Sequence, residues 1–112
     1  MKLLIAGSRN ITEFDIAPYI PKETSTIISG GAKGIDTLAE EYADKNGLDK
    51  IIIRPDYEKY GRAAPIKRNY QMVDMADEIL AVWDGFSKGT QSTIKYAQKN
   101  GKKVNIIIID RS

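Results

Sequence analysis

The stretch SGGAKGIDTLAEEYA, residues 29–43, decides the fold and raises the question of function. Three glycines stand near its start, and a helical pattern follows them directly. Apolar residues from Ile35 to Ala43 recur at the i, i+3, i+4, i+7 spacing that puts them on one helix face. Such a glycine cluster suits a bound phosphate, because backbone amides and a helix N-terminus favour an anion. It equally suits a plain tight turn, so this loop alone leaves both interpretations open.

Strand-like and helix-like segments alternate along the whole chain. The helical periods cover 35–46, a segment that starts at Pro65, and a segment from about Thr90 to Asn100. The first connection is weaker, because two prolines limit its helix to a turn or two. The apolar runs expected to form buried strands are 2–7, 24–31, 49–56, 78–85 and 102–110. The residues expected to be buried in the helix that starts at Pro65 are Ile66, Tyr70, Val73 and Ala76.

This alternation predicts the fold class. Five strands separated by four helices favour a doubly wound, three-layer α/β fold around a five-stranded, mainly parallel sheet. We expect residues 1–112 to form a single domain of this kind. In such sheets ligands bind beyond the carboxyl ends of the strands, where the strand order reverses. The strand-to-helix loops are therefore where chemistry is expected.

Composition narrows the function classes. The chain has 42% hydrophobic residues, a net charge of +2, no cysteine and no histidine. Disulfides, thiolate chemistry, imidazole catalysis and the usual transition-metal sites are thereby excluded, and no cofactor is expected. The apolar runs are too short for a signal peptide or a membrane span, so a cytoplasmic protein is expected. The nearly balanced charge disfavours a dedicated nucleic-acid binder.

A second glycine-containing loop, SKGT at residues 87–90, also opens a helix after a strand. Two such loops on one sheet edge favour anion binding over two unrelated turns. Neither loop is a known nucleotide motif, because the chain has no GxxxxGK[ST] sequence and no GxGxxG after the first strand. Asp36, in the first turn of its helix, either complements the helix dipole or accepts a ribose hydroxyl.

Four segments occur in the order typical of one superfamily: IAGSRN, IISGGAKGIDTLAEEYA, APIKRNYQMVDMAD and AVWDGFSKGTQSTIKYAQKNGKKV. Together they make the chain resemble the SLOG superfamily, most closely its small group related to YspA and YpsA. More distant relatives are the LOG-type cytokinin-activating phosphoribohydrolases and the DNA-processing protein DprA. The resemblance covers nearly the whole chain. It implies a Rossmann-like fold that binds nucleotides or nucleotide-derived molecules.

The resemblance also suggests which residues form the pocket. Arg9 and Arg68 could each grip a phosphate, although a turn residue and a surface charge are the alternatives. Asn69 could cap its helix instead, Lys33 and Lys88 could be solvated, and Trp83 could stack on a base or belong to the core. The residues predicted to bind ligand or phosphate are Gly7, Ser8, Arg9, Gly30, Gly31, Gly34, Asp36, Arg68, Asn69, Asp84, Ser87, Lys88, Gly89 and Thr90.

One departure from the resemblance bears on catalysis. The phosphoribohydrolases carry PGGxGTxxE, and its glutamate serves the N-glycosidic chemistry. Here Thr93 follows GTxx, and residues 83–87 replace the PGG portion. Asp84 could substitute for this glutamate as the catalytic residue, although an Asp-Gly turn is its common structural role. The absence of the glutamate argues against an enzyme.

Three functions therefore stay open. We expect a module that binds a nucleotide-derived small molecule, such as an ADP-ribose derivative, as a sensor or by sequestration. The alternative is a phosphoribohydrolase-like hydrolase with Asp84 or Asp36 as its base. Single-stranded DNA binding, as in DprA, is a weaker alternative that would use the basic and aromatic segment 54–68. Apolar-faced helices in so small a domain also suggest a homodimer.

Overall fold

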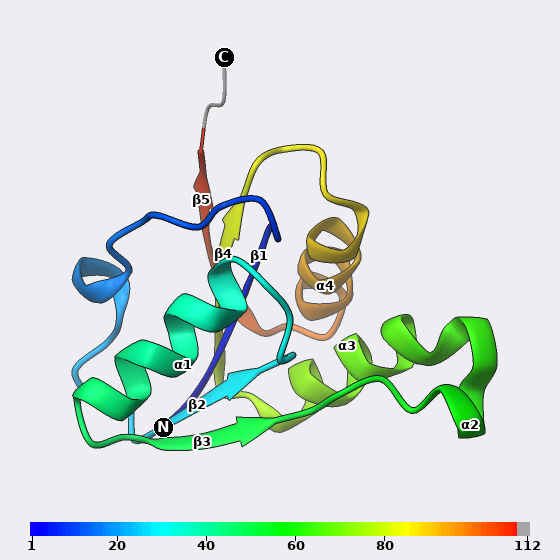
Figure 1. Cartoon of the computed structure of the whole chain (residues 1–112), viewed down its shortest axis with the longest axis horizontal. Helices are drawn as coiled ribbons and strands as arrows, with labels where there is room; N and C mark the ends of the chain where they lie inside the picture. Colours follow the sequence, from blue (N-terminus) through cyan, green and yellow to red (C-terminus); the bar gives the residue numbers. More distant parts are fainter. Residues whose placement is uncertain (110–112) are drawn as a thin grey trace.

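The computed structural model describes residues 1–109 and has a three-layer α/β architecture (Figure 1). Its five-stranded sheet has the order β3-β2-β1-β4-β5, and every neighbouring pair is parallel. The predicted fold class is confirmed, with a sheet that is parallel throughout. The strands are β1 (Lys2–Gly7), β2 (Thr26–Ser29), β3 (Asp49–Ile52), β4 (Glu78–Trp83) and β5 (Lys103–Ile108).

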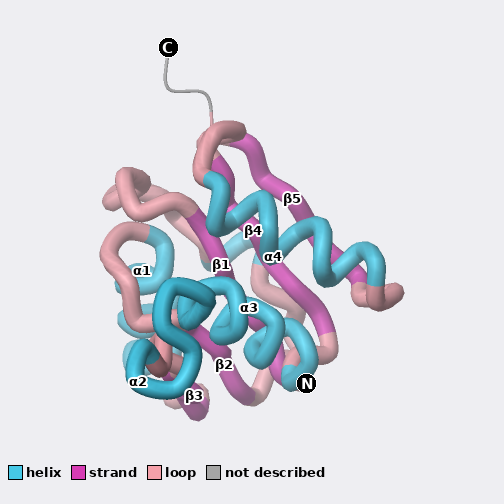
Figure 2. The backbone as a smooth tube through the Cα atoms, turned by 90° about the vertical axis from the view of Figure 1, so that its right-hand side faces the viewer, coloured by secondary structure: helices cyan, strands magenta, loops and turns pink. Residues whose placement is uncertain are grey.

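The helices lie on both faces of the sheet. One face carries α1 together with the long connection 8–25, and the opposite face carries α3 and α4 (Figures 1 and 2). Among residues 1–109, no helix is long and apolar enough to cross a membrane. The helices are α1 (Ile35–Lys45), α2 (Tyr57–Tyr60), α3 (Ala64–Met75) and α4 (Lys88–Lys99), with short 3-10 turns η1 (Ala17–Tyr19) and η2 (Gly61–Ala63).

Four strands, β2 to β5, are shorter than the apolar runs that predicted them. β2 covers 26–29 where the sequence suggested 24–31, because Gly30 and Gly31 already belong to the loop. β3 ends at Ile52, and β4 ends at Trp83. The run 102–110 yields β5 over Lys103–Ile108, and Asp110 lies outside the described residues. The apolar pattern therefore located each strand, but the last residues of these runs belong to the loops that follow the strands.

The long segment after β3 contains a short helix that the sequence pattern did not reveal. α2 is a single turn, and the Asp56 side chain caps it by accepting a hydrogen bond from the Lys59 N–H at 3.1 Å. This turn carries the chain from β3 to α3. Proline at the start of α3 fits its role as a first-turn residue.

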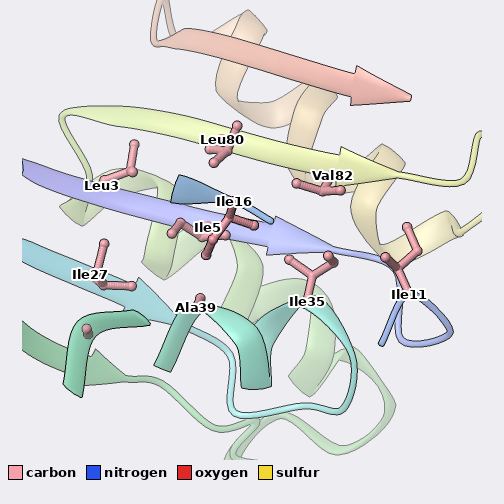
Figure 3. Close-up of a cluster of buried hydrophobic side chains, with 10 residues drawn as sticks. Leu3, Ile5, Ile11, Ile16, Ile27, Ile35, Ala39, Leu80 and Val82 are labelled. Atoms are coloured by element: carbon pink, nitrogen blue, oxygen red, sulfur yellow. The ribbon is translucent and has the colours of Figure 1, made fainter. Parts of the chain in front are cut away.

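The first connection, 8–25, covers the sheet without forming an α-helix. Its only regular element is η1, and Asp15 supports it by accepting a hydrogen bond from the Ala17 N–H at 3.1 Å. Ile11 and Ile16 point from this connection into the core beside Leu80 and Val82 (Figure 3). These two buried isoleucines thus supply the apolar contacts that one face of a helix would otherwise make with the sheet.

The second core lies under α3 and α4, and one sequence prediction about it is wrong. Met72, Val73 and Ala76 pack against β1, β2 and β4. Ile66, which the helical spacing assigned to this core, is instead 46% exposed. It falls in the first turn of α3, where the helix extends past the sheet toward α2, and Ala64 takes the buried position.

A matched pair of substitutions tests this assignment. Ile16→Ala should lower the free energy of unfolding by about 2–5 kcal/mol, because it removes a buried side chain and leaves a cavity. Ile66→Ala removes the same atoms from a half-exposed site and should cost about 1 kcal/mol or less. Urea unfolding of both variants measures the difference. Equal losses would contradict the placement of the two side chains.

Candidate functional site

A pocket lies where the strand order reverses, at the carboxyl ends of β1 and β4. These two strands pair from Leu3 opposite Glu78 to Gly7 opposite Val82, so their following loops leave the sheet side by side. The pocket encloses about 310 Å³. Its walls come from the loop after β1, both glycine loops, α3 and α4. The lining residues are Ala6, Gly7, Arg9, Asn10, Ala32, Asp36, Pro65, Arg68, Asn69, Met72, Ser87, Gly89, Thr90 and Thr93.

Ser8 lies beneath the pocket and ties its walls together. Its N–H donates to the Val82 carbonyl at 3.1 Å, and its hydroxyl accepts from the Asp84 N–H at 3.1 Å. Its carbonyl accepts from the N–H groups of Ile11 and Ile35 at 3.3 and 3.4 Å. Because the residue is completely buried, we assign Ser8 a structural role instead of the ligand contact expected from the sequence.

Gly34 allows the start of α1 to lie close to the loop after β1. Its φ of 74° lies in the left-handed region, and it forms the N-cap of α1. A Cβ at this position would collide with the backbone carbonyls of Ser8 and Arg9. The glycine is therefore required for the close approach of α1 to the loop after β1, and it does not line the pocket itself.

The first glycine loop uses several of its own hydrogen-bond donors. The Gly31 N–H donates to the Ser29 hydroxyl at 3.2 Å, and the Ala32 N–H donates to the Asp36 carboxylate at 3.1 Å. The Gly31 carbonyl accepts from Arg54 at 3.1 Å. The Ala32 N–H therefore already donates to Asp36 and is not available to a bound anion. This loop has the character of a structural turn, the second of the two interpretations that the sequence left open.

The start of α4 is arranged differently. Within residues 1–109, the N–H groups of Lys88, Gly89 and Thr90 make no hydrogen bond, and no side chain caps the helix. No acidic residue stands in its first turn. Ser87, the N-cap, lines the pocket together with Gly89 and Thr90. The free amides of this first turn make this end of the pocket suited to an anion.

Arg68 adds a positive charge to the same pocket. Its Nη1 donates to the Gly30 carbonyl at 2.8 Å and to the Ile53 carbonyl at 3.4 Å, while Nε donates to Asn69 Oδ1 at 2.9 Å. Within the described chain, Nη2 has no hydrogen-bond partner and is available to a ligand. Burial lowers the pKa of Arg68, but the ordinary pKa of arginine is high enough that the side chain stays charged.

Asp36 is the buried carboxylate of the pocket. Only 8% of the residue is exposed. Burial raises its pKa above the ordinary value of 3.8, and the hydrogen bond from Ala32 and the nearby charge of Arg68 offset this in part. The carboxylate does not come close enough to Arg68 to form an ion pair. It can therefore accept a hydrogen bond from a hydroxyl group or exchange a proton with a ligand.

Asp84, one of the two aspartates that the sequence suggested as a catalytic base, does not line the pocket. Its Oδ1 accepts from the N–H groups of Ser87 and Phe86, both at 2.8 Å, and its Oδ2 accepts from Asn10 at 3.2 Å. The Ser87 and Phe86 hydrogen bonds lower the pKa of Asp84 to about 2. A carboxylate this acidic is a poor base, and its hydrogen bonds instead hold the loop that leads into α4.

The structure thus separates the predicted site residues into two groups. Those that line the pocket are Gly7, Arg9, Asp36, Arg68, Asn69, Ser87, Gly89 and Thr90. Those outside the lining are Ser8, Gly30, Gly31, Gly34, Asp84 and Lys88. Gly30 lies behind Arg68, and Lys88 is exposed.

Six further residues line the pocket without having been predicted as ligand contacts. Asn10 directly follows the predicted Arg9, so its position could have been included. Thr93 stands where the phosphoribohydrolases have glutamate, and its hydroxyl donates to the Gly89 carbonyl at 3.1 Å. That position therefore faces the pocket but offers no carboxylate. The others, Ala6, Ala32, Pro65 and Met72, carry no chemical signal in the sequence.

Two glycines that both have a positive φ test the role of Gly34. Gly34→Ala should lower the free energy of unfolding by about 2–5 kcal/mol, since backbone strain adds to a collision with two carbonyls. Gly101→Ala has a similar φ of 71° with nothing near its Cβ, so it should cost only about 1–2 kcal/mol. Urea unfolding compares the two. Equal costs would mean that the contact with the Ser8 loop is unimportant.

Asp36→Asn should stabilise the protein at neutral pH. The raised pKa of Asp36 means that the folded state disfavours the charged carboxylate. This residue therefore contributes stability below its unfolded pKa and loses that contribution as the pH rises through its folded pKa. The variant should be more stable than the wild type at pH 7 and lose that advantage below pH 3.8. Thermal melts between pH 3 and 8 measure this, and a variant less stable at pH 7 would contradict it.

Comparison with known proteins gives a family. The YspA, cpYpsA-related SLOG family matches residues 1–60, which carry β1 to α2 and hence the first two pocket loops. The Gene 61 protein of Mycobacterium phage D29 is 35% identical over 81 residues, which are 67% of this chain and 65% of that protein. The uncharacterized SPbeta prophage-derived protein YoqJ of Bacillus subtilis strain 168 is 37% identical over 65 residues, 55% of this chain and 37% of that protein.

The chain spans less than two thirds of the length of either relative. No solved structure matches it significantly. The family match covers more than half of the 112 residues and includes the first two of the loops that build the pocket. The chain therefore belongs to the YspA, cpYpsA-related SLOG family.

Proposed function

We propose that this protein binds a nucleotide or a nucleotide-derived small molecule, such as an ADP-ribose derivative, as a sensor or by sequestering it. Membership of the SLOG family indicates a nucleotide-related function. The observation that carries the proposal is the pairing of two features in one pocket. The free amides at the start of α4 and the charged Arg68 both border the same cavity.

The phosphate end of the ligand belongs at α4. The two helices that begin beside the pocket differ in what their first turns already hold. In α1 the first turn contains Asp36, whose carboxylate accepts from the Ala32 N–H and repels an anion, whereas the first turn of α4 contains no acidic residue. Arg9 and Arg68 supply the compensating charge from the facing walls. Asn69 fixes the orientation of Arg68 through its contact with Nε.

The sugar end of the ligand belongs near Asp36. A buried carboxylate without an ion-pair partner is suited to accept hydrogen bonds from ribose hydroxyls. The pocket volume of about 310 Å³ is at the low end of the range for small-molecule sites. It therefore suits a phosphoribosyl group, with the base held toward the opening. Phe86, which is 84% exposed next to Ser87, offers a face for stacking there.

Hydrolysis of an N-glycosidic bond is the second candidate, and one observation favours it. Asp36 lines the pocket and has a raised pKa, as a general acid or base requires. Asp84 lacks both properties. Binding without turnover remains the preferred function, because the position that carries glutamate in the phosphoribohydrolases holds Thr93, which offers only a hydroxyl.

Gly89 offers a sharp test of the phosphate subsite. A Cβ atom at this position meets nothing within 4 Å, so Gly89→Ala fits the fold and Gly89→Asp starts from an open position. The aspartate places a negative charge among the α4 amides and should weaken binding of ADP-ribose and AMP by about 1.5–3 kcal/mol, roughly tenfold or more. The alanine keeps the amides and the charge balance and should bind nearly as well as the wild type. Calorimetry measures both affinities.

Several outcomes would decide against the proposal. Equal affinity of the two variants would place the phosphate elsewhere. No binding of ADP-ribose, AMP or inorganic phosphate by the wild type would remove the basis for a nucleotide pocket. Chromatography after long incubation tests the second candidate, because release of free base that Asp36→Asn abolishes would make the protein a hydrolase.

A further inference from the structure

The two edges of the sheet differ in how they are protected. β3, at one edge, is four residues long, begins with the exposed charges Asp49 and Lys50, and is followed by Arg54 and Pro55. Charges, prolines and short length are the usual devices that keep an edge strand from pairing with another chain. β5, at the other edge, has six residues and none of these features after Lys103. Figure 2 shows β5 on the outside of the sheet with no element beyond it.

The backbone of β5 presents a regular row of hydrogen-bonding groups outward. The Ile109 N–H donates to the Trp83 carbonyl at 2.8 Å, so the odd-numbered residues face β4. Since backbone direction alternates along a strand, Val104, Ile106 and Ile108 turn their N–H and C=O groups to the open edge. Within residues 1–109 these groups have no partner. Three residues spaced by two thus form a template for one more strand.

The side chains of the same residues form an apolar strip. Ile108 is 65% exposed, and Val104 and Ile106 are half-buried. Strand alternation puts all three on the face that carries α4, where Val104 packs against the second core. On the opposite face Ile107 and Ile109 lie at the margin of the first core, only partly covered. An added strand would bury apolar surface on both faces.

We propose that β5 pairs antiparallel with β5 of a second copy, so that two sheets join into one of ten strands. The strand is complementary to itself. A two-fold axis at Ile106 sets Ile106 opposite its own copy and Val104 opposite Ile108, and all three outward residues are paired. No like charges meet, because Lys103 faces Ile109. The exposed Ile108 then packs against Val104 and Ile106 of the partner subunit.

This pairing assigns the homodimer a surface different from the helices that the sequence suggested. The apolar faces of α1, α3 and α4 are used by the two cores of the same copy. The antiparallel arrangement also turns the carboxyl edges of the two sheets in opposite directions. Each copy therefore keeps its pocket complete and open, and ligand binding does not depend on dimerisation.

The chain contains no cysteine, so single cysteines report the register directly. Ile106→Cys should form a covalent dimer on mild oxidation, because facing residues of an antiparallel pair lie about 5.5 Å apart between Cα atoms, within disulfide range. Ile108→Cys is more exposed but lies opposite Val104 in this register, so it should remain uncross-linked. Non-reducing gels compare the two. Cross-linking of Ile108→Cys with none of Ile106→Cys would overturn the register.

The mass in solution tests the dimer without cross-linking. Light scattering should give the wild type twice the chain mass of 12.5 kDa. Ile108→Lys should give the single-chain mass with an unchanged circular dichroism spectrum, since the residue is solvent-facing in each copy. Ile66→Lys, which changes an exposed isoleucine on α3, should leave the dimer intact. A monomeric wild type, or a dimer that survives Ile108→Lys, would overturn the proposal.

Discussion

One buried residue, Ser8, joins three of the segments that surround the pocket through its hydrogen bonds. It bonds to β4 through Val82, to the loop after β4 through the Asp84 N–H, and to the start of α1 through the Ile35 N–H. Three loops that are distant in the sequence thereby share one anchor at the point where the strand order reverses. The loop after β1 can lie this close to β4 and α1 because a Cβ at Gly7 would collide with Val82 and Ile35, and one at Gly34 would collide with Ser8 and Arg9. A parallel sheet brings these loops to one edge, and Ser8 sets their spacing.

The two glycine loops look alike in sequence but have different chemistry. In the first loop, Gly34 prevents a collision with the backbone of Ser8 and Arg9. The N–H groups of Gly31 and Ala32 already donate to the Ser29 hydroxyl and the Asp36 carboxylate. In the second, Asp84 holds the chain ahead of the helix by accepting from Phe86 and Ser87. It satisfies the amides before α4 and leaves those of its first turn free. The first turn of α4 contains no acidic residue, whereas the first turn of α1 contains Asp36, which disfavours a bound anion.

The sequence predicts the alternation of strands and helices because apolar periodicity reports which face is buried. It also predicts that the glycine loops share an edge, since all the strands are parallel. It cannot tell Ser8 from Ser87, because burial of a hydroxyl depends on which carbonyls and amides surround it in three dimensions. Asp84 and Asp36 are ambiguous for the same reason, and their pKa values move in opposite directions. Ile66 fits the helical spacing, but spacing does not reveal where the sheet beneath a helix stops.

Two features of this protein lower its stability as an isolated chain without any structural benefit. The buried Asp36 keeps a charge where an asparagine could accept the same hydrogen bond from Ala32. The β5 edge keeps isoleucines in water where the β3 edge uses charges and a proline. In natural proteins such local conflicts concentrate where function needs them. One conflict lies inside the pocket at the switch point, and the other lies on the outer strand, far from the walls of that pocket. The proposed ligand and the proposed second copy would therefore be recognised by different interactions: directed polar groups at the pocket, and backbone pairing with apolar burial at β5.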